Sequence, residues 1–276
     1  MKWFKFILSH SIFIAFCALA LCYQTYTILK IKPDPWYYGF VFFATLSSYN
    51  FYWSLSRYSF NRSLSLNEYI RLNISHLSIF LFSGLCMLGF LFFLFPYYLY
   101  ICGAILLTLM YSLPLWPFQF VKFTQKAGFL KPVLLAATWA FITVIVPASV
   151  HPELSSVPVL VLLTARFLFM LLLCVIFDMR DIRIDKLHAL HTLATDVSRR
   201  SLQLIIYLVF ALYIICGLFV RAYFNEPAQL YAFALTGIAV WIVYKLSLKT
   251  RGYFFYYFLV DGMMIISAMA TFIAAF

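Results

Sequence analysis

Charged side chains are scarce in this chain of 276 residues: they make up 11% of it, and only nine of them are acidic. A soluble globular domain carries about 25% charged residues, so a water-facing surface around a single buried core is excluded. A disordered chain is excluded as well, because disorder requires high charge and few apolar side chains. The sequence leaves no room for a separate soluble domain.

Cysteine pairs with a recognisable spacing are also missing. The six cysteines all fall in apolar segments, and no two of them form a C-x-x-C or metal-binding spacing. This excludes a secreted disulfide scaffold and a zinc-type site, and it predicts that the cysteines serve as small apolar side chains in helix packing.

Apolar residues, by contrast, are abundant. They make up 65% of the chain, aromatic residues make up 21%, and the mean hydropathy is +0.96. Such a composition indicates lipid as the solvent, and a spanning helix needs about 20 mostly apolar residues. The sequence predicts an all-α, polytopic membrane bundle of about nine transmembrane helices that forms one domain over residues 1–276. The predicted spans are Phe6–Leu29, Trp36–Leu55, His76–Phe95, Tyr97–Leu113, Val133–Val150, Pro158–Phe177, Leu202–Phe224, Ala228–Tyr244 and Phe254–Ala275.

The basic residues predict the orientation of these spans. Sixteen of the 20 lysines and arginines fall on the side of the N-terminus, and only Lys30, Lys32 and Arg221 fall on the other side. Because cytoplasmic loops of membrane proteins are enriched in Lys and Arg, we expect a multi-pass protein of the cytoplasmic (inner) membrane. Its N-terminus is expected inside and its C-terminus outside. The net charge of +11 then reflects basic loops beside anionic lipid, and no nucleic acid or protein partner is expected.

Acidic residues cluster after the sixth predicted span. Asp178, Asp181 and Asp185 are spaced i, i+3 and i+7, which places them on one face of a helix in successive turns. Carboxylates brought together in this way suit a hard cation such as Mg²⁺, which leaves coordination positions for substrate phosphates. The alternative is that they form local ion pairs with Arg180 and Arg183 on a solvated helix end.

The chain resembles the UbiA-type intramembrane prenyltransferases over nearly its whole length, and two segments carry motifs similar to those of the family. Residues 177–186, with the sequence FDMRDIRIDK, are followed by His191-Thr192-Leu193-Ala194 and resemble the family's second aspartate-rich motif, D-x-x-D-x-x-x-D. Tyr111-Ser112-Leu113-Pro114, followed by Lys122 and Leu130-Lys131-Pro132, resembles its Y-S-x-P segment and basic loop.

This resemblance implies a helical bundle around a central cavity, with Mg²⁺ and a prenyl diphosphate held by aspartates. It implies transfer of the prenyl group to a lipophilic acceptor of aromatic or quinone type. Asp178, Asp181 and Asp185 are the implied catalytic and metal-binding residues. The implied substrate-binding residues are Asn50, Arg57, Tyr111, Lys122 and Lys131.

The family's first motif, N-D-x-x-D-x-x-x-D, is largely lost. Asn50 matches its asparagine, but Phe51, Ser54 and Tyr58 occupy the aspartate positions, and no acidic residue lies between Trp36 and Glu68. We expect Arg57, with Arg62, to bind an anionic head group directly through paired donors. The alternative is that both are ordinary basic residues of an inner loop.

Two further charged residues, Arg166 and Asp261, fall within predicted spans. Ionisable groups in lipid are costly and usually face a cavity or a partner, so we expect these two to pair with each other.

Three functions stay open. The first is a prenyltransferase, and the second is a non-catalytic relative that binds an isoprenoid or another lipid. The third is a small-molecule transporter, which is disfavoured because no half-length repeat or broken helix pair is visible.

Overall fold

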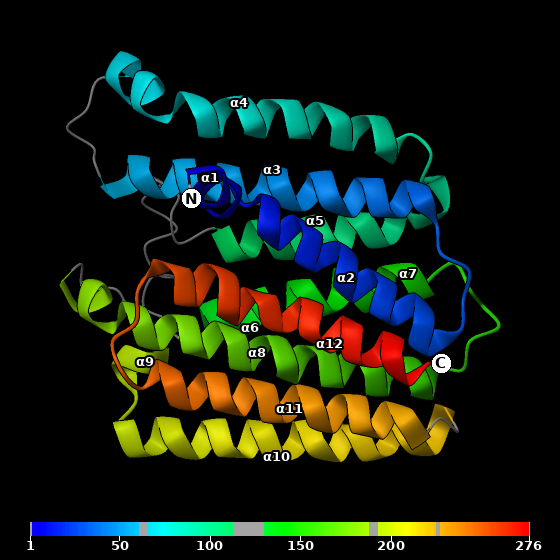
Figure 1. Ribbon diagram of the computed structural model, residues 1–276. Coiled ribbons are helices and arrows are strands. Elements are labelled where there is room, and N and C mark those ends of the chain that lie inside the picture. Colours follow the sequence, from blue (N-terminus) through cyan, green and yellow to red (C-terminus); the bar gives the residue numbers. More distant parts are fainter. Residues whose placement is uncertain (1, 61–65, 113–129, 188–192, 225–226, 276) are drawn as a thin grey trace.

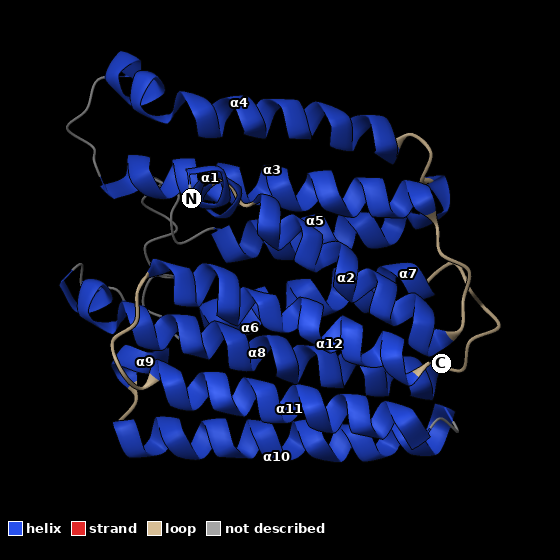
Figure 2. Ribbon diagram, in the orientation of Figure 1, coloured by secondary structure: helices blue, strands red, loops and turns tan. Residues whose placement is uncertain are grey.

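The computed structural model describes residues 2–60, 66–112, 130–187, 193–224 and 227–275. Its described part is helical throughout, with helices joined by turns and loops (Figure 2). The long helices run side by side in one bundle, and the two chain termini lie at opposite ends of it (Figure 1). The predicted all-α polytopic bundle is therefore confirmed.

Eight helices in the described residues are long and apolar enough to cross a membrane. The α-helices that form them are α2 (Ile12–Leu29), α4 (Leu66–Leu91), α5 (Tyr98–Ser112), α6 (Leu130–Ala140), α8 (Ser156–Leu187), α10 (Arg199–Phe224), α11 (Pro227–Ser247) and α12 (Asp261–Ala274). Shorter elements are α1 (Lys2–Ser9), the 3₁₀ turn η1 (Phe95–Tyr97), α7 (Val146–Ala148) and α9 (Leu193–Asp196).

The remaining predicted span, Trp36–Leu55, corresponds to α3 (Pro35–Phe60), whose 26 residues are long enough to cross a bilayer. Its sequence is less apolar than the other eight because serine, asparagine and tyrosine recur along it. The helix begins where Asp34 Oδ1 accepts hydrogen bonds from the backbone N–H groups of Trp36 and Tyr37, at 2.9 and 3.4 Å. This is the usual arrangement of an N-cap, with Pro35 in the first helical position.

The first predicted span, Phe6–Leu29, is wrong at its start. The helix breaks at His10 and Ser11, where Ser11 adopts a left-handed conformation with a φ of 63°. The short α1 is seen nearly end-on against the bundle in Figure 1. The Phe4 ring lies 5.5 Å from Phe254 and 5.2 Å from Phe258. Apolar contacts with the last helical segment therefore turn α1 away from the axis of α2.

Two helices contain π-helical segments, η4 (Phe141–Ile145) and η5 (Phe255–Val260). The first lies just before Pro147, which has no N–H to donate to the preceding turn and so disturbs the regular ladder. The second directly precedes Asp261. Because a π-segment inserts an extra residue into a turn, it changes which face of α12 carries the following side chains.

Buried side chains from α2, α3, α6, α8, α10, α11 and α12 form a continuous core. All six cysteines lie in described residues and none forms a disulfide, as the sequence predicts. Polar contacts fix the register between α2 and α12. The Gln24 amide on α2 donates to the Ser267 and Thr271 hydroxyls on α12, at 3.0 and 2.7 Å. Hydrogen bonds of this kind hold helices together in lipid, where apolar contact alone gives little preference.

Candidate functional site

The aspartates of the second motif lie toward the C-terminal end of α8. Asp178 is buried, with 7% of its surface exposed, and Asp181 is half-buried. The backbone of Asp185 continues the same helix, but its side chain lies outside the described residues. The structure therefore places the first two of the three predicted carboxylates at the boundary between the core and the helix end.

Asp181 forms an ion pair with its neighbour on the chain. Arg180 Nε and Nη2 donate to the two carboxylate oxygens of Asp181 at 2.6 and 2.7 Å. The Arg180 guanidinium also lies 5.1 Å from the ring centres of Phe177, Tyr256 and Tyr257. Aromatic faces attract a cation at such distances, so Arg180 is held over the start of the last helix.

Asp261 brings a further carboxylate to this end of the bundle, from α12. Its side chain is buried, with 7% of its surface exposed, and Arg180 is the cation that acts on it electrostatically. Asp261 also lies near enough to Tyr49 and Cys174 to interact with them electrostatically, and Cys174 is influenced by Asp178 as well. The two buried carboxylates therefore border the same region of the core.

The expected pairing of Asp261 with Arg166 is wrong. Arg166 Nη2 donates to the Leu21 carbonyl and the Thr25 hydroxyl of α2, at 3.3 and 3.4 Å. Arg166 and Asp261 lie on different helices, and Arg166 bonds α2 instead of the α12 carboxylate. Sequence alone does not determine such inter-helix register.

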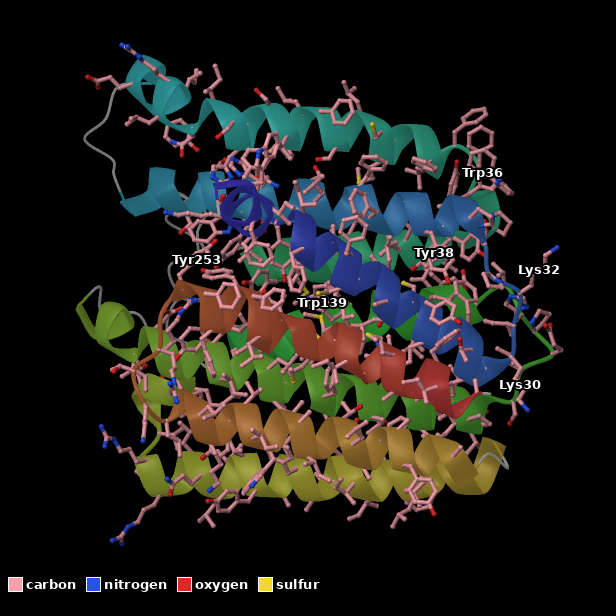
Figure 3. All side chains as sticks on the ribbon, in the orientation of Figure 1. Lys30, Lys32, Trp36, Tyr38, Trp139 and Tyr253 are labelled. Atoms are coloured by element: carbon pink, nitrogen blue, oxygen red, sulfur yellow. The ribbon has the colours of Figure 1, made fainter. Side chains whose placement is uncertain are left out.

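Tyrosines from α3 and α5 border the same region as the carboxylates. Trp139 Nε1 of α6 donates to the Tyr49 hydroxyl at 3.3 Å, and Trp139 lies in the interior of the bundle (Figure 3). The Tyr52 and Tyr111 rings stack with their centres 5.2 Å apart. Tyr111 is also influenced electrostatically by Tyr49. Tyr111, a predicted substrate-binding residue, thus belongs to this aromatic wall.

We refer to these side chains together as the tyrosine–aspartate cluster: Tyr49, Tyr52, Tyr111, Asp178, Arg180, Asp181, Tyr257 and Asp261. Predicted residue Lys131 of α6 is half-buried and acts electrostatically on Cys174, so it lies at the border of the cluster. Lys122 and the side chain of Arg57 lie outside the described residues.

Tyr253 lies just outside the last spanning segment, at the end of the bundle where α8 ends (Figure 3). Its ring stacks on Tyr257 at 4.2 Å. Burial, with smaller contributions from Tyr257 and Asp261, raises the pKa of Tyr253 to about 12. The phenol therefore stays protonated at neutral pH and retains its hydroxyl donor beside the cluster.

Asn50, the remaining predicted substrate contact, has its amide engaged in packing. Its Nδ2 donates to the His10 and Leu46 carbonyls, both at 2.9 Å, and its Oδ1 lies 2.8 Å from His76 Nδ1. The residue has no exposed surface. Asn50 therefore joins α3 to α4 and to the break between α1 and α2, whereas Tyr49 beside it contacts α6.

The face of α3 that would carry the first motif packs on α4. The Phe51 ring lies 5.3 Å from Phe80, and the Tyr69 hydroxyl donates to the Ser54 carbonyl at 2.6 Å. At two positions where the family has aspartates, Phe51 and Ser54 therefore make apolar and backbone contacts between α3 and α4. The residues that α3 contributes to the cluster are Tyr49 and Tyr52, and Trp53 of the same helix lies 6.4 Å from the Tyr257 ring.

The donor chemistry of the cluster suits Mg²⁺, since its anionic groups are carboxylates from α8 and α12. In the part of the chain with described side chains, no group of three histidines, cysteines or acids is arranged to hold a metal ion. Asp181 binds Arg180 in this arrangement, and Asp185 is the ligand whose side chain is not described. Arg180 therefore occupies part of the accepting capacity of Asp181 at the predicted metal site.

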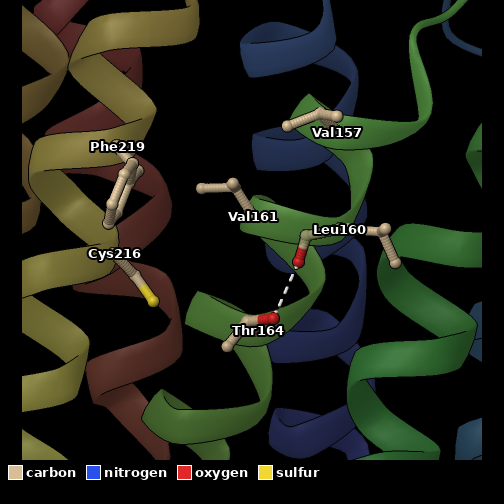
Figure 4. A pocket seen from close by; sticks show the side chains of 6 residues that line it. All are labelled: Val157, Leu160, Val161, Thr164, Cys216 and Phe219. Carbon is tan, nitrogen blue, oxygen red and sulfur yellow. Dashed lines mark hydrogen bonds between the residues drawn. The ribbon is translucent and has the colours of Figure 1, made fainter.

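A cavity of about 200 Å³ lies away from the cluster, near the N-terminal end of α8. Figure 4 shows it between α8 and α10, lined by Val157, Leu160, Val161, Thr164, Cys216 and Phe219. The Thr164 hydroxyl donates to the Leu160 carbonyl of its own helix. The lining offers few polar groups and suits contact with lipid chains rather than with a diphosphate.

Comparison with solved structures supports the fold. The chain is similar to the apo structure of a UbiA homolog from Aeropyrum pernix K1, with a TM-score of 0.61 and 13% sequence identity. The match covers 96% of this chain and 98% of that one. No family model matches the sequence, and no curated protein matches it. The chain therefore has a UbiA-like fold.

Sequence reasoning predicted the α8 aspartates, Tyr111 and Lys131 as site residues, and the structure brings Asp178, Asp181, Tyr111 and Lys131 to the same end of the bundle as Asp261, which the sequence marked as a charge within lipid. Sequence reasoning gave no sign of the rings that surround Arg180. Aromatic residues occur throughout this chain, so Tyr256 and Tyr257 carry no local signal that separates them from lipid-facing rings.

Proposed function

We propose that the chain is a membrane prenyltransferase that transfers a prenyl group from a prenyl diphosphate to a lipophilic acceptor. The acceptor class is an aromatic or quinone-type lipid. The observation that carries the proposal is the meeting of Asp178, Arg180 and Asp261 beside a wall of tyrosines, at the end of a bundle with a UbiA-like fold.

The reaction begins when the C–O bond between the prenyl group and the diphosphate breaks and the diphosphate leaves with the bonding electrons. The acceptor then forms a new bond to the allylic carbon and loses a proton. Arg180 and Lys131 are the cations of the described site that stabilise the departing diphosphate. The faces of Tyr49, Tyr52 and Tyr111 stabilise positive charge on the allylic group.

Asp178, Asp181 and Asp185 would hold Mg²⁺, which when bound neutralises charge on the diphosphate and favours its departure. In our proposal Asp261 supplies part of the negative charge that α3 lacks. Burial of the cluster among rings limits the access of water, which would otherwise capture the allylic cation.

A second candidate is a protein that binds an isoprenoid diphosphate or a related lipid without turning it over. It is favoured by the ion pair between Arg180 and Asp181, which occupies a predicted metal ligand. It is also favoured by the contacts of Phe51 and Ser54 with α4, because these positions then contribute nothing to a second metal.

The test uses the purified full-length protein in lipid nanodiscs, with Mg²⁺, labelled prenyl diphosphates of several lengths and a membrane lipid extract. We expect diphosphate release together with a labelled lipid product, and loss of both in Asp178→Asn and Asp181→Asn. Glu153→Gln, which changes an exposed acid in the turn before α8, is the matched control and should keep full activity. Binding of the labelled diphosphate without release, at every chain length, would favour the second candidate.

We further propose that the cluster faces the cytoplasm, with the N-terminus inside and the C-terminus outside the inner membrane. The distribution of Lys and Arg supports this orientation. Cysteine labelling from each side of sealed vesicles tests it. A Lys249→Cys variant should be labelled from the cytoplasmic side and a Lys32→Cys variant from the outside.

A further inference from the structure

Lys245 is a lysine inside a membrane-spanning segment. The apolar span of α11 covers Ala228–Ser247, so Lys245 lies close to its C-terminal end. The side chain is exposed on the surface of the bundle and does not enter the core. In a bilayer such a side chain faces lipid, at the depth where the acyl chains meet the head groups.

Three aromatic rings surround the Lys245 ammonium on its protein side. Its Nζ lies 4.5 Å from the ring centre of Trp241, 5.6 Å from that of Tyr207 and 5.7 Å from that of Tyr244. The rings also contact one another, since the Trp241 ring lies 5.4 Å from Tyr207 and 5.6 Å from Tyr244. Ring faces attract the ammonium and hold it in place, but they are neutral and leave its charge uncompensated.

Carboxylates are scarce around this end of α10 and α11. Asp196 of α9 is the only acid in residues 193–224 and 227–253. Neither of the ion pairs found among the described side chains involves Lys245. Because a cation at membrane depth is costly without an opposite charge, a partner from outside the protein is favoured.

Further cations lie just beyond Lys245, at the same end of the bundle. α10 and α11 run side by side in opposite directions along one edge of the bundle (Figure 1). The contact between the Tyr207 and Trp241 rings marks one level of this helix pair. At the rise of an α-helix, Arg199 on α10 and Lys249 after α11 both lie about 12 Å farther toward the end. Both side chains are exposed, and neither takes part in a described ion pair.

We propose that this end of α10 and α11 binds the head group of an anionic glycerophospholipid, whose phosphate lies among Lys245, Arg199 and Lys249. A lipid phosphate carries the missing negative charge at the depth of these side chains, and basic pockets between spanning helices bind such head groups in other membrane proteins. The acyl chains would follow exposed apolar side chains farther along both helices, among them Leu204 and Ile242. The proposal is independent of prenyl transfer.

The test uses the fluorescence of Trp241, whose ring is the nearest of the three to Lys245. The purified protein is reconstituted in phosphatidylcholine bilayers that contain the same small fraction of a lipid with brominated acyl chains, either phosphatidylglycerol or phosphatidylcholine. Bromine quenches an indole that it contacts, and the difference between each protein and its Trp241→Phe form isolates this one indole. We expect brominated phosphatidylglycerol to quench Trp241 several-fold more strongly than brominated phosphatidylcholine.

The variants separate the charge of Lys245 from its packing. Lys245→Gln should abolish most of the preference for the anionic lipid, whereas Lys245→Arg should retain it because the charge remains. The double substitution Arg199→Gln and Lys249→Gln leaves Lys245 and the rings in place and should also lower the preference several-fold. Arg71→Gln is the matched control, since it removes an exposed arginine of α4 at the opposite edge of the bundle, and it should leave the preference unchanged.

Equal quenching of Trp241 by the two brominated lipids, or a full preference in Lys245→Gln, would overturn the proposal. An equal loss in Arg71→Gln would also overturn it, because anionic lipid would then gather at any basic loop. Displacement of the lipid by millimolar glycerol phosphate would overturn the lipid assignment in favour of a soluble phosphate.

Discussion

Arg180 holds Asp181 through two parallel hydrogen bonds of 2.6 and 2.7 Å, although the two residues are adjacent on α8. The pair is half-buried among aromatic rings, with side-chain exposures of 25% and 32%. Arg180 therefore competes with any cation that binds Asp181. We therefore expect Arg180 to lower the affinity of Asp181 for a metal ion, an effect that the spacing of the aspartates alone does not predict.

Removal of the Arg180 cation should strengthen metal binding at the aspartates. In Arg180→Met the affinity for Mn²⁺, used as a spectroscopic probe for Mg²⁺, should rise several-fold because a competing positive charge is gone. Electron paramagnetic resonance of free Mn²⁺ measures the change. Arg251→Met is the control, since Arg251 is exposed, donates to the Leu246 carbonyl at 2.9 Å and lies over the Phe255 ring at 5.6 Å. Unchanged affinity in Arg180→Met would show that the ion pair does not limit access to Asp181.

Asp261 should matter for diphosphate release if it belongs to the catalytic region. Asp261→Asn keeps the size of the side chain and removes its charge. We expect the rate of release to fall roughly a hundredfold, comparable to the loss of one electrostatic contact in an enzyme site. Labelled diphosphate release measures the change, and the midpoint of thermal unfolding checks that the bundle is intact. A wild-type rate in a folded Asp261→Asn protein would restrict the site to the α8 aspartates.

The hydrogen bonds of Asn50 should stabilise the junction of α1, α3 and α4. Asn50→Ala should lower the free energy of unfolding by about 1–2 kcal/mol, the scale of inter-helix hydrogen bonds in membranes. A double-mutant cycle with His76→Ala isolates the shared contact, because Oδ1 of Asn50 lies 2.8 Å from Nδ1 of His76. Denaturant or thermal unfolding in mixed micelles measures each variant. Strict additivity of the two substitutions would contradict a direct interaction.

Gly39 marks a close approach between α3 and α4. A Cβ atom at this position would overlap the Phe90 ring, which is itself packed against Trp36 and Phe43. Gly39→Ala should therefore destabilise the protein by about 1–3 kcal/mol through overpacking. Thermal unfolding measures the loss, and a second substitution, Phe90→Ala, should relieve the overlap.

Gly89→Ala is the matched control for this prediction. In the described part of the chain, no atom beyond the adjacent residues and the local helix backbone lies within 4 Å of a Cβ built at Gly89, which is also in α4. Alanine favours a helix over glycine by about 0.5–1 kcal/mol, so this variant should be as stable as the wild type or slightly more stable. Equal destabilisation by both substitutions would show that the close approach of Gly39 is not the cause.

The sequence by itself determined the solvent of this protein, its helical class and the position of most spans. These properties follow from local quantities, namely the fraction of apolar residues and the length of the apolar runs. It also predicted that Asp178 and Asp181 share one face of a helix, because an i, i+3 spacing fixes two side chains on one face without reference to the rest of the fold.

The tertiary structure decided how these elements meet. In the folded bundle Asn50 contacts His76, Arg166 bonds α2 rather than Asp261, and Asp261 lies near the α8 aspartates. Each outcome depends on the rotation and height of one helix relative to another. Packing of side chains distant in sequence determines these quantities, and the apolar pattern of a buried helix fits several registers equally well.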